Sequence, residues 1–123
     1  PITTTTQLSD ITKRVVGART RGRRLRIHPA SRVMMALRIY VNGELEELSQ
    51  FLDQVPALLR PQGRVAIQCY HSLESRLVKH RWRAQKQQGL LQELKDSPVK
   101  PTEREVRRNR RVRSVQMRVA EKP

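Results

Sequence analysis

The residues best suited to chemistry lie at one junction, where His71, Ser72 and Glu74 follow an apolar segment. Residues 65–70 are almost continuously apolar, which is typical of a strand covered on both faces, as parallel strands are. Ser72 fits a helix N-cap, and Glu74 would then lie in the first turn, where the helix dipole favours a carboxylate. Open α/β sheets bind ligands outside the carboxyl ends of their strands, so this junction is a candidate ligand site. The alternative interpretation is a helix cap with a histidine in the turn.

Cys69 is the single cysteine of the chain, and we interpret it as a core residue. It shares a strand face with His71, which superficially suggests a thiol nucleophile. Two residues apart on one strand is a poor geometry for proton transfer, and nothing in the sequence orients the histidine. A zinc site is also not expected, because the single cysteine and the three histidines do not have the spacing of zinc ligands. A lone cysteine fits a reducing compartment.

The charge of the chain points to a polyanionic partner. The formal net charge is +15, and residues 11–43 contain nine Lys or Arg and no acid. Nucleic acid is the first candidate partner and an anionic membrane surface the second; no apolar run approaches the roughly 18 residues that span a bilayer. Two Arg-rich segments, 19–26 and 107–113, are either solvated surface or RNA contacts, and we favour RNA. The candidate RNA-binding residues are Arg19, Arg21, Arg23, Arg24, Arg26, Arg32, Arg38, Arg76, Lys79, Arg107, Arg108, Arg110, Arg111 and Arg113.

Helical spacing of apolar residues predicts most of the elements that hold these side chains. A short helix is expected at 3–16, capped by Thr6 or Ser9. Residues 30–60 should form two or three helical pieces, because Asn42-Gly43 weakens the pattern and Pro56 must kink or restart it. After a turn at 60–63, a helix is expected at 72–88. Its inward residues would be Leu73, Leu77 and Val78, and Trp82 on it is either packing or a surface for stacking a base.

The last third of the chain combines one ambiguous segment with two clear ones. Residues 90–101 could extend a helix or lead into a short strand. Thr102 and Glu105 have the spacing of a capping box, which predicts a short helix at 102–108. Residues 114–120 alternate, which predicts a strand with Val115, Met117 and Val119 on its buried side.

Several stretches, in order and over nearly all 123 residues, match one family. The matching pieces are Thr5-Thr6-Gln7-Leu8, His28-Pro29-Ala30-Ser31-Arg32, Ala36-Leu37-Arg38-Ile39-Tyr40-Val41-Asn42, Leu59-Arg60-Pro61-Gln62-Gly63-Arg64, Tyr70-His71-Ser72-Leu73-Glu74-Ser75-Arg76-Leu77-Val78-Lys79 and Asn109-Arg110-Arg111-Val112-Arg113-Ser114. The chain resembles the carboxyl-terminal part of the S-adenosylmethionine-dependent small-subunit rRNA (cytosine-N4)-methyltransferases of the MraW type.

The resemblance implies an α/β fold, the C-terminal part of a class I (Rossmann-like) methyltransferase with an incomplete sheet and flanking helices. Residues 1–27 would be a helix plus an Arg-rich loop left from a helical insertion, and 28–123 the C-terminal half of the α/β domain. The family uses S-adenosylmethionine, but the Gly-rich turn expected for that cofactor has no counterpart in this sequence. We therefore expect no cofactor binding by this chain alone, and an unpaired edge on the strand at 64–70 that another segment or chain must cover.

For the site, the resemblance implies a cleft near His71, Ser72 and Glu74, close to a flipped target base. Methylation at N4 depends mainly on positioning the exocyclic amine. Asn42 is a further cleft candidate, with a helix-bend role as its alternative. The chain departs from the family at Met34-Met35, at Ser75, where the family has Asp, and at Arg110, where it has Pro.

Two functions remain from different classes. The first is the RNA-binding C-terminal portion of an rRNA methyltransferase, acting on small-subunit rRNA or a ribosomal assembly particle. The second is a catalytically inactive relative that serves as a ribosome-assembly or ribosome-bound factor, which the departures favour. A generic DNA-binding domain lacks any recognition-helix or finger pattern. The bacterial cytoplasm is the expected location, with a mitochondrion or another organelle as the alternative.

Overall fold

The computed structural model describes residues 1–19 and 28–123. Their contacts divide the chain into two compact units, Pro1–Glu44 and Leu45–Pro123, which are described separately. The division predicted between residues 27 and 28 rests on the resemblance to a helical insertion and stays a prediction.

The first unit consists of two helices in contact with each other, α1 (Thr5–Arg19) and α2 (Pro29–Asn42). The predicted first helix is confirmed, but its predicted cap is wrong. The hydroxyl of Thr4, and not of Thr6 or Ser9, accepts from the Gln7 backbone N–H at 3.2 Å, and the Gln7 side-chain oxygen accepts from the Thr4 backbone N–H at 3.2 Å. Such a reciprocal pair satisfies two amides that a helix start leaves without partners.

The expected break between residues 30 and 60 falls at Gly43. This residue has φ +61°, a left-handed conformation that glycine adopts at little cost, and its N–H bonds the Ile39 and Tyr40 carbonyls to end α2. The next helix, α3 (Glu44–Leu58), continues through Pro56, so the chain does not restart there. Two helical pieces are therefore confirmed, separated by the glycine.

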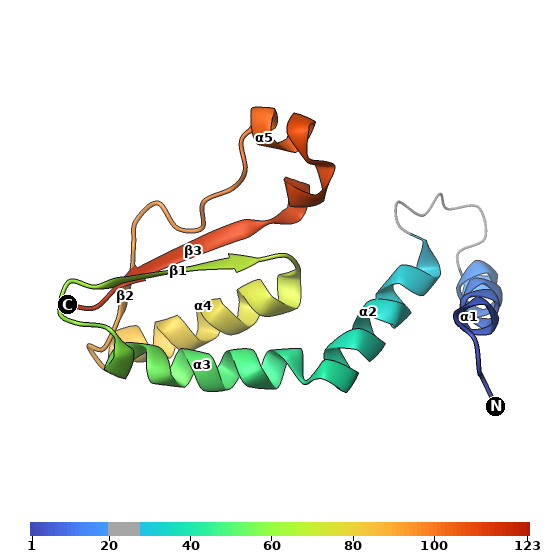
Figure 1. Ribbon diagram of the computed structural model, residues 1–123, viewed down its shortest axis with the longest axis horizontal. Coiled ribbons are helices and arrows are strands. Elements are labelled where there is room, and N and C mark those ends of the chain that lie inside the picture. Colours follow the sequence, from blue (N-terminus) through green and yellow to red (C-terminus); the bar gives the residue numbers. More distant parts are fainter. Residues whose placement is uncertain (20–27) are drawn as a thin grey trace. The chain divides into compact units, whose positions relative to one another are not determined.

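The second unit is a small α/β arrangement (Figure 1). After α3 come β1 (Arg64–Cys69), α4 (Ser72–Gln87), β2 (Gln92–Glu93), α5 (Glu103–Arg108), the 3₁₀ helix η1 (Arg110–Ser114) and β3 (Gln116–Glu121). The sheet has the order β1-β3-β2, and both pairings are antiparallel, with Arg64 opposite Glu121 and Cys69 opposite Gln116. Helices α3 and α4 lie on one side of the sheet and α5 on the other (Figure 1).

The prediction of a parallel strand with both faces covered is wrong for β1 within this chain. Its only strand partner among the described residues is β3, which runs antiparallel to it. Val65, Ile67 and Cys69 turn toward the core, whereas Ala66 and Gln68 are exposed. An apolar alanine on the open face made the segment look uniformly buried. The other edge of β1 has no strand partner in the described residues, and a segment or chain that covers it stays a prediction.

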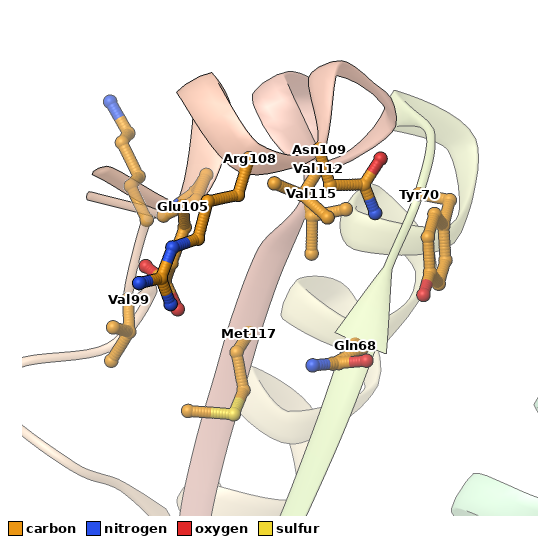
Figure 2. A pocket seen from close by; sticks show the side chains of 11 residues that line it. Gln68, Tyr70, Val99, Glu105, Arg108, Asn109, Val112, Val115 and Met117 are labelled. Carbon is orange, nitrogen blue, oxygen red and sulfur yellow. The ribbon is translucent and has the colours of Figure 1, made fainter. Parts of the chain in front are cut away.

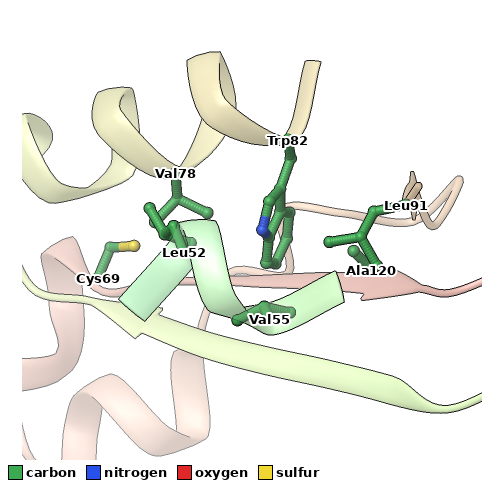
Figure 3. Packing of buried hydrophobic residues seen from close by; sticks show 7 residues of the cluster. All are labelled: Leu52, Val55, Cys69, Val78, Trp82, Leu91 and Ala120. Atoms are coloured by element: carbon green, nitrogen blue, oxygen red, sulfur yellow. The ribbon is translucent and has the colours of Figure 1, made fainter. Parts of the chain in front are cut away.

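The core lies between the sheet and the helices α3 and α4 (Figure 3). Its fully buried members are Leu52, Val55, Cys69, Val78, Trp82, Leu91 and Ala120. Cys69 and Trp82 are thus packing residues, and Trp82 is no stacking surface for a base, because only 1% of it is exposed. Leu73, predicted to point inward, is exposed instead.

The C-terminal segment closes this unit against the turn after α3. Gly63 donates to the Arg60 carbonyl at 2.8 Å, and a Cβ at Gly63 would meet that same oxygen at 2.7 Å, so the turn requires glycine. Lys122 exchanges backbone hydrogen bonds with Gln62 and Gly63. Its ammonium group also donates to the carbonyls of Pro56 and Leu59 at the end of α3. A cation there satisfies carbonyls that the helix end leaves free.

Candidate functional site

The junction after β1 is a reciprocal helix cap in which His71, not Ser72, is the N-cap. The Nδ1 atom of His71 accepts from the Glu74 backbone N–H at 3.3 Å, and Glu74 Oε2 accepts from the His71 and Tyr70 backbone N–H groups at 3.2 and 2.7 Å. The predicted cap at Ser72 is therefore wrong by one residue; Ser72 is the first residue of α4. The junction prefers His71 because its imidazole reaches the N3 amide while Glu74 reaches back.

This geometry constrains what His71 can do. Because Nδ1 accepts a hydrogen bond, the proton of a neutral ring sits on Nε2. That atom lies 3.3 Å from Glu74 Oε1, close enough for an ion pair but without the alignment of a hydrogen bond to any described residue. A small rotation of the ring would align Nε2 with the Glu74 carboxylate. His71 and Glu74 thus act as a helix cap, and a cleft at these residues stays a prediction.

Cys69 lies beside this cap and is not a nucleophile. Burial, and then the nearby Glu74 carboxylate, raise the pKa of the thiol above its ordinary value, with Arg118 opposing them. A raised pKa keeps the sulfur protonated at neutral pH, whereas a nucleophilic cysteine needs the thiolate. The structure agrees with the core interpretation.

Asn42 lies in the other unit, at the end of α2. Its side-chain amide donates to Glu44 at 3.2 Å, and Arg38 pairs with the same carboxylate at 2.9 Å. These contacts fit the helix-bend alternative. A role for Asn42 in a cleft stays a prediction.

The predicted buried side is correct for Val115, which is buried just before β3, and wrong for Met117 and Val119 within the strand. Ala120 and Arg118 face the core with Val65 and Ile67, the residues opposite them on β1, whereas Met117 and Val119 lie on the opposite face. The guanidinium of Arg118 is buried because it donates to Glu93 at 2.5 Å and to the Ser75 hydroxyl at 3.1 Å. Ser75 in turn donates to Gln116 at 2.8 Å. This buried polar network was missed, since an arginine between valines is normally taken as solvent-facing.

On the opposite face, α5 and η1 enclose a cavity of about 330 Å³ against β1 and β3 (Figure 2). We call it the sheet pocket. It is lined by Gln68, Tyr70, Val99, Lys100, Pro101, Glu105, Arg108, Asn109, Val112, Val115 and Met117. The predicted capping box holds α5 over it, with Thr102 and Glu105 bonded reciprocally at 3.3 and 2.7 Å.

A second, more open hollow adjoins the sheet pocket and shares Tyr70 with it. We call it the arginine hollow; its lining is Tyr70, Arg110, Arg111, Arg113 and Ser114. All three arginines are exposed, and no residue of η1 is buried. The sequence indicated these arginines but not the pocket, because its walls come from two segments, 68–70 and 99–117, that are far apart in the chain.

The other predicted RNA-binding residues are dispersed. Arg32 and Arg38 are exposed on α2, Arg76 and Lys79 on α4, and Arg107 and Arg108 on α5. Arg19 ends α1, and Arg21, Arg23, Arg24 and Arg26 lie outside the described residues. The α5–η1 arginines border the sheet pocket and the arginine hollow, and Lys79 lines a separate hollow with Arg83 and Lys86.

Comparison with known proteins places these features in a family. The model of the MraW methylase family matches residues 1–123. Among similar proteins, each named "Ribosomal RNA small subunit methyltransferase H", that of Acaryochloris marina is 44% identical over 99% of this chain and 40% of its own length. The proteins from Maridesulfovibrio salexigens and Synechococcus sp. are 43% and 48% identical, over 98% of this chain and 42% and 36% of their own lengths. The chain spans about two fifths of the relatives it matches. It belongs to the MraW methylase family.

Proposed function

We propose that this chain is the RNA-binding C-terminal portion of a small-subunit rRNA methyltransferase that acts on N4 of cytosine. The family match over the whole chain supports the reaction class. The observation that carries the RNA-binding role is the group of exposed arginines on α5 and η1 beside a cavity. Arginine pairs with phosphate through two parallel N–H groups, and such contacts dominate affinity for nucleic acid.

S-adenosylmethionine is the methyl donor that the family implies, and the described residues do not fit it. Among the described glycines, Gly17 lies inside α1, Gly43 ends α2, Gly63 closes a turn and Gly89 follows α4; none opens a helix after a strand. The tight strand-to-helix turn after β1 is occupied by the His71–Glu74 cap. We propose that the cofactor binds residues outside this chain, in a Rossmann-like domain whose sheet the free edge of β1 joins.

The inactive assembly factor is not favoured, since the similar proteins are named methyltransferases. One of the departures that suggested it, Ser75, is buried in the Arg118 network and lines neither cavity. We propose the bacterial cytoplasm as the location, because the similar proteins are named as rRNA methyltransferases of bacteria. None of the described helices is both long and apolar enough to cross a membrane.

The RNA-binding role is tested by salt dependence. We compare the full chain with Arg110→Gln/Arg111→Gln/Arg113→Gln for binding to a fragment of small-subunit rRNA. Each lost phosphate contact should reduce the slope of log affinity against log salt by about 0.7 to 0.9. A second triple variant, Arg21→Gln/Arg23→Gln/Arg24→Gln, tests the other Arg-rich segment in the same way.

The matched control is Arg60→Gln/Arg64→Gln/Arg83→Gln, which removes the same charge from exposed positions elsewhere in the second unit. Equal slopes for the cluster and control variants would rule out the α5–η1 arginines as the RNA contact. Methyl transfer is measured separately, with the complete native polypeptide, S-adenosylmethionine and unmodified rRNA. Failure to label N4 of cytosine would contradict the proposed reaction.

A further inference from the structure

The sheet pocket and the arginine hollow differ in chemistry and share one wall, the ring of Tyr70. Tyr70 follows β1 directly and lies on the same face as Gln68, two residues earlier and opposite Met117. Its side chain is 57% exposed, so it is not required by the core. Figure 2 shows the ring at one side of the pocket, next to Gln68 and Asn109. Tyr70 therefore stands between an apolar cavity and a cationic one.

The sheet pocket suits a small planar group with polar edges. Its volume of about 330 Å³ is near the lower end of the roughly 300–1,000 Å³ of ligand pockets. Val112, Val115 and Met117 provide apolar walls, and the side-chain amides of Gln68 and Asn109 provide hydrogen-bonding groups. Asn109 Oδ1 accepts from the Arg111 backbone N–H at 3.0 Å, so the Nδ2 of Asn109 is the atom that can donate to a ligand.

The charges around the two cavities favour an anionic chain that carries such groups. The arginine hollow contributes three exposed guanidinium groups. Lys100 and Arg108 line the sheet pocket against a single acid, Glu105, whose carboxylate is already bound by the Thr102 backbone N–H and hydroxyl. A nucleotide matches this pair of cavities, because it carries a flat base for the sheet pocket next to a phosphate for the arginine hollow.

We propose that the sheet pocket takes one unstacked nucleobase of single-stranded RNA, that Tyr70 stacks on it, and that the arginine hollow binds the neighbouring phosphates. This inference rests on the proposed RNA-binding function and goes further by naming where a base enters. Stacking on an aromatic ring and hydrogen bonding of splayed-out bases are how proteins recognise unpaired RNA.

The test measures binding of the full chain to two oligonucleotides of equal length and charge, one single-stranded RNA and one ribose-phosphate chain without bases. Tyr70→Ala should weaken binding to the RNA about tenfold, because stacking on one base is worth roughly 1–3 kcal/mol. Tyr70→Phe keeps the ring and should stay within about twofold of the original. The matched control is Tyr40→Ala, which removes a tyrosine that is 85% exposed on α2.

On the base-free chain, the original protein and Tyr70→Ala should bind equally, and on the RNA their salt slopes should be equal, since no charge is removed. Equal affinity of the two proteins for the RNA, or an equal loss on both oligonucleotides, would overturn the pocket assignment. An acidic peptide that binds in a Tyr70-dependent way, while RNA does not, would overturn it in favour of a protein ligand.

The same data separate this inference from the proposed function. Salt-dependent RNA binding that is indifferent to Tyr70 refutes the pocket and leaves the arginine contacts standing. Absence of salt-dependent RNA binding refutes both. Thermal unfolding of each variant, expected to match the original, shows that the exposed ring was not needed for folding.

Discussion

On one face of the sheet, α3 and α4 bury Leu52, Val78 and Trp82 almost completely. On the other face, α5 and η1 contribute no buried residue and leave a cavity of about 330 Å³ above β1 and β3. Both faces use the same two strands, so the difference comes from what covers them. The first face is closed by long helices with apolar stripes, the second by short elements held by caps and turns.

The difference separates stability from binding. A closed apolar face supplies folding energy through burial, which is the main favourable term in folding. Short capped elements add little burial and keep their arginines in solvent, where an anion can reach them. We therefore expect changes on the α3–α4 face to cost stability, and changes on the α5–η1 face to cost RNA affinity with little effect on folding.

The largest expected effect is at Trp82, the largest fully buried side chain. Trp82→Ala should lower the free energy of unfolding by about 3–5 kcal/mol, through lost burial and the cavity left behind. The control on the same helix is Leu73→Ala, at a residue that is 39% exposed, which should cost below about 1 kcal/mol. Urea unfolding followed by circular dichroism measures both, since Trp82 is the single tryptophan. A similar cost for the two variants would mean that α4 packs through another face.

The buried ion pair of Arg118 gives the next effect, and it should be asymmetric. The Arg118 side chain is 9% exposed and that of Glu93 27% exposed, so Glu93→Gln leaves the more deeply buried charge uncompensated. Removing one partner of a buried pair costs about 3–5 kcal/mol, and we expect Glu93→Gln near 3 because Glu93 is partly exposed. Arg118→Met should cost less.

The control for this pair is on the same sheet. Arg64 and Glu121 pair at 2.6 Å across β1 and β3, but their side chains are 66% and 31% exposed. Exposed pairs contribute about 0–1 kcal/mol, so Glu121→Gln should be nearly neutral. Equal costs for Glu93→Gln and Glu121→Gln, measured by denaturant unfolding, would show that burial of Arg118 carries no penalty.

The two faces also differ in how far the sequence predicts them. The cap of α5 was predicted in full, because Thr102 and Glu105 are the residue types and spacing of a capping box. The cap of α4 was placed at Ser72, the usual residue type, whereas the fold uses the His71 imidazole. Local patterns thus predicted where helices begin, and the choice between neighbouring residues depended on geometry that the sequence does not contain.

The prediction of which β3 side chains face the core was wrong in part for a similar reason. Counting apolar residues put Val115, Met117 and Val119 inside; Val115 is buried, but within β3 the core side carries Arg118 and Ala120. Arg118 can be buried only because Glu93, 25 residues away, meets it. Partners that distant in sequence leave no periodic signal. For the same reason the arginines of the candidate site were named from composition, while the pocket beside them was not.

The two caps allow a smaller test of the comparison. Loss of an N-cap costs about 0.5–2 kcal/mol. His71→Ala should fall at the upper end, because the side chain is only 10% exposed and Glu74 loses its partner in a partly buried site. Thr102→Ala should fall at the lower end, since that box is exposed. Ser72→Ala is the control and should be neutral. If Ser72→Ala lowered the free energy of unfolding as much as His71→Ala, the serine and not the histidine would be the N-cap.

The smallest effect concerns pH and should be confined to α5. Two hydrogen bonds from Thr102, first from its backbone N–H and then from its hydroxyl, lower the pKa of Glu105 below its ordinary value of 4.5. Because the folded-state pKa is the lower one, the cap contributes fully above the ordinary value and is lost as pH falls through the lowered pKa. Chemical shifts of α5 recorded down to about pH 3 should report fraying while β1 and β3 keep theirs. Glu105→Gln should remove the transition; its persistence would assign the acid sensitivity to another carboxylate, and loss of all signals together would show that the two faces unfold as one.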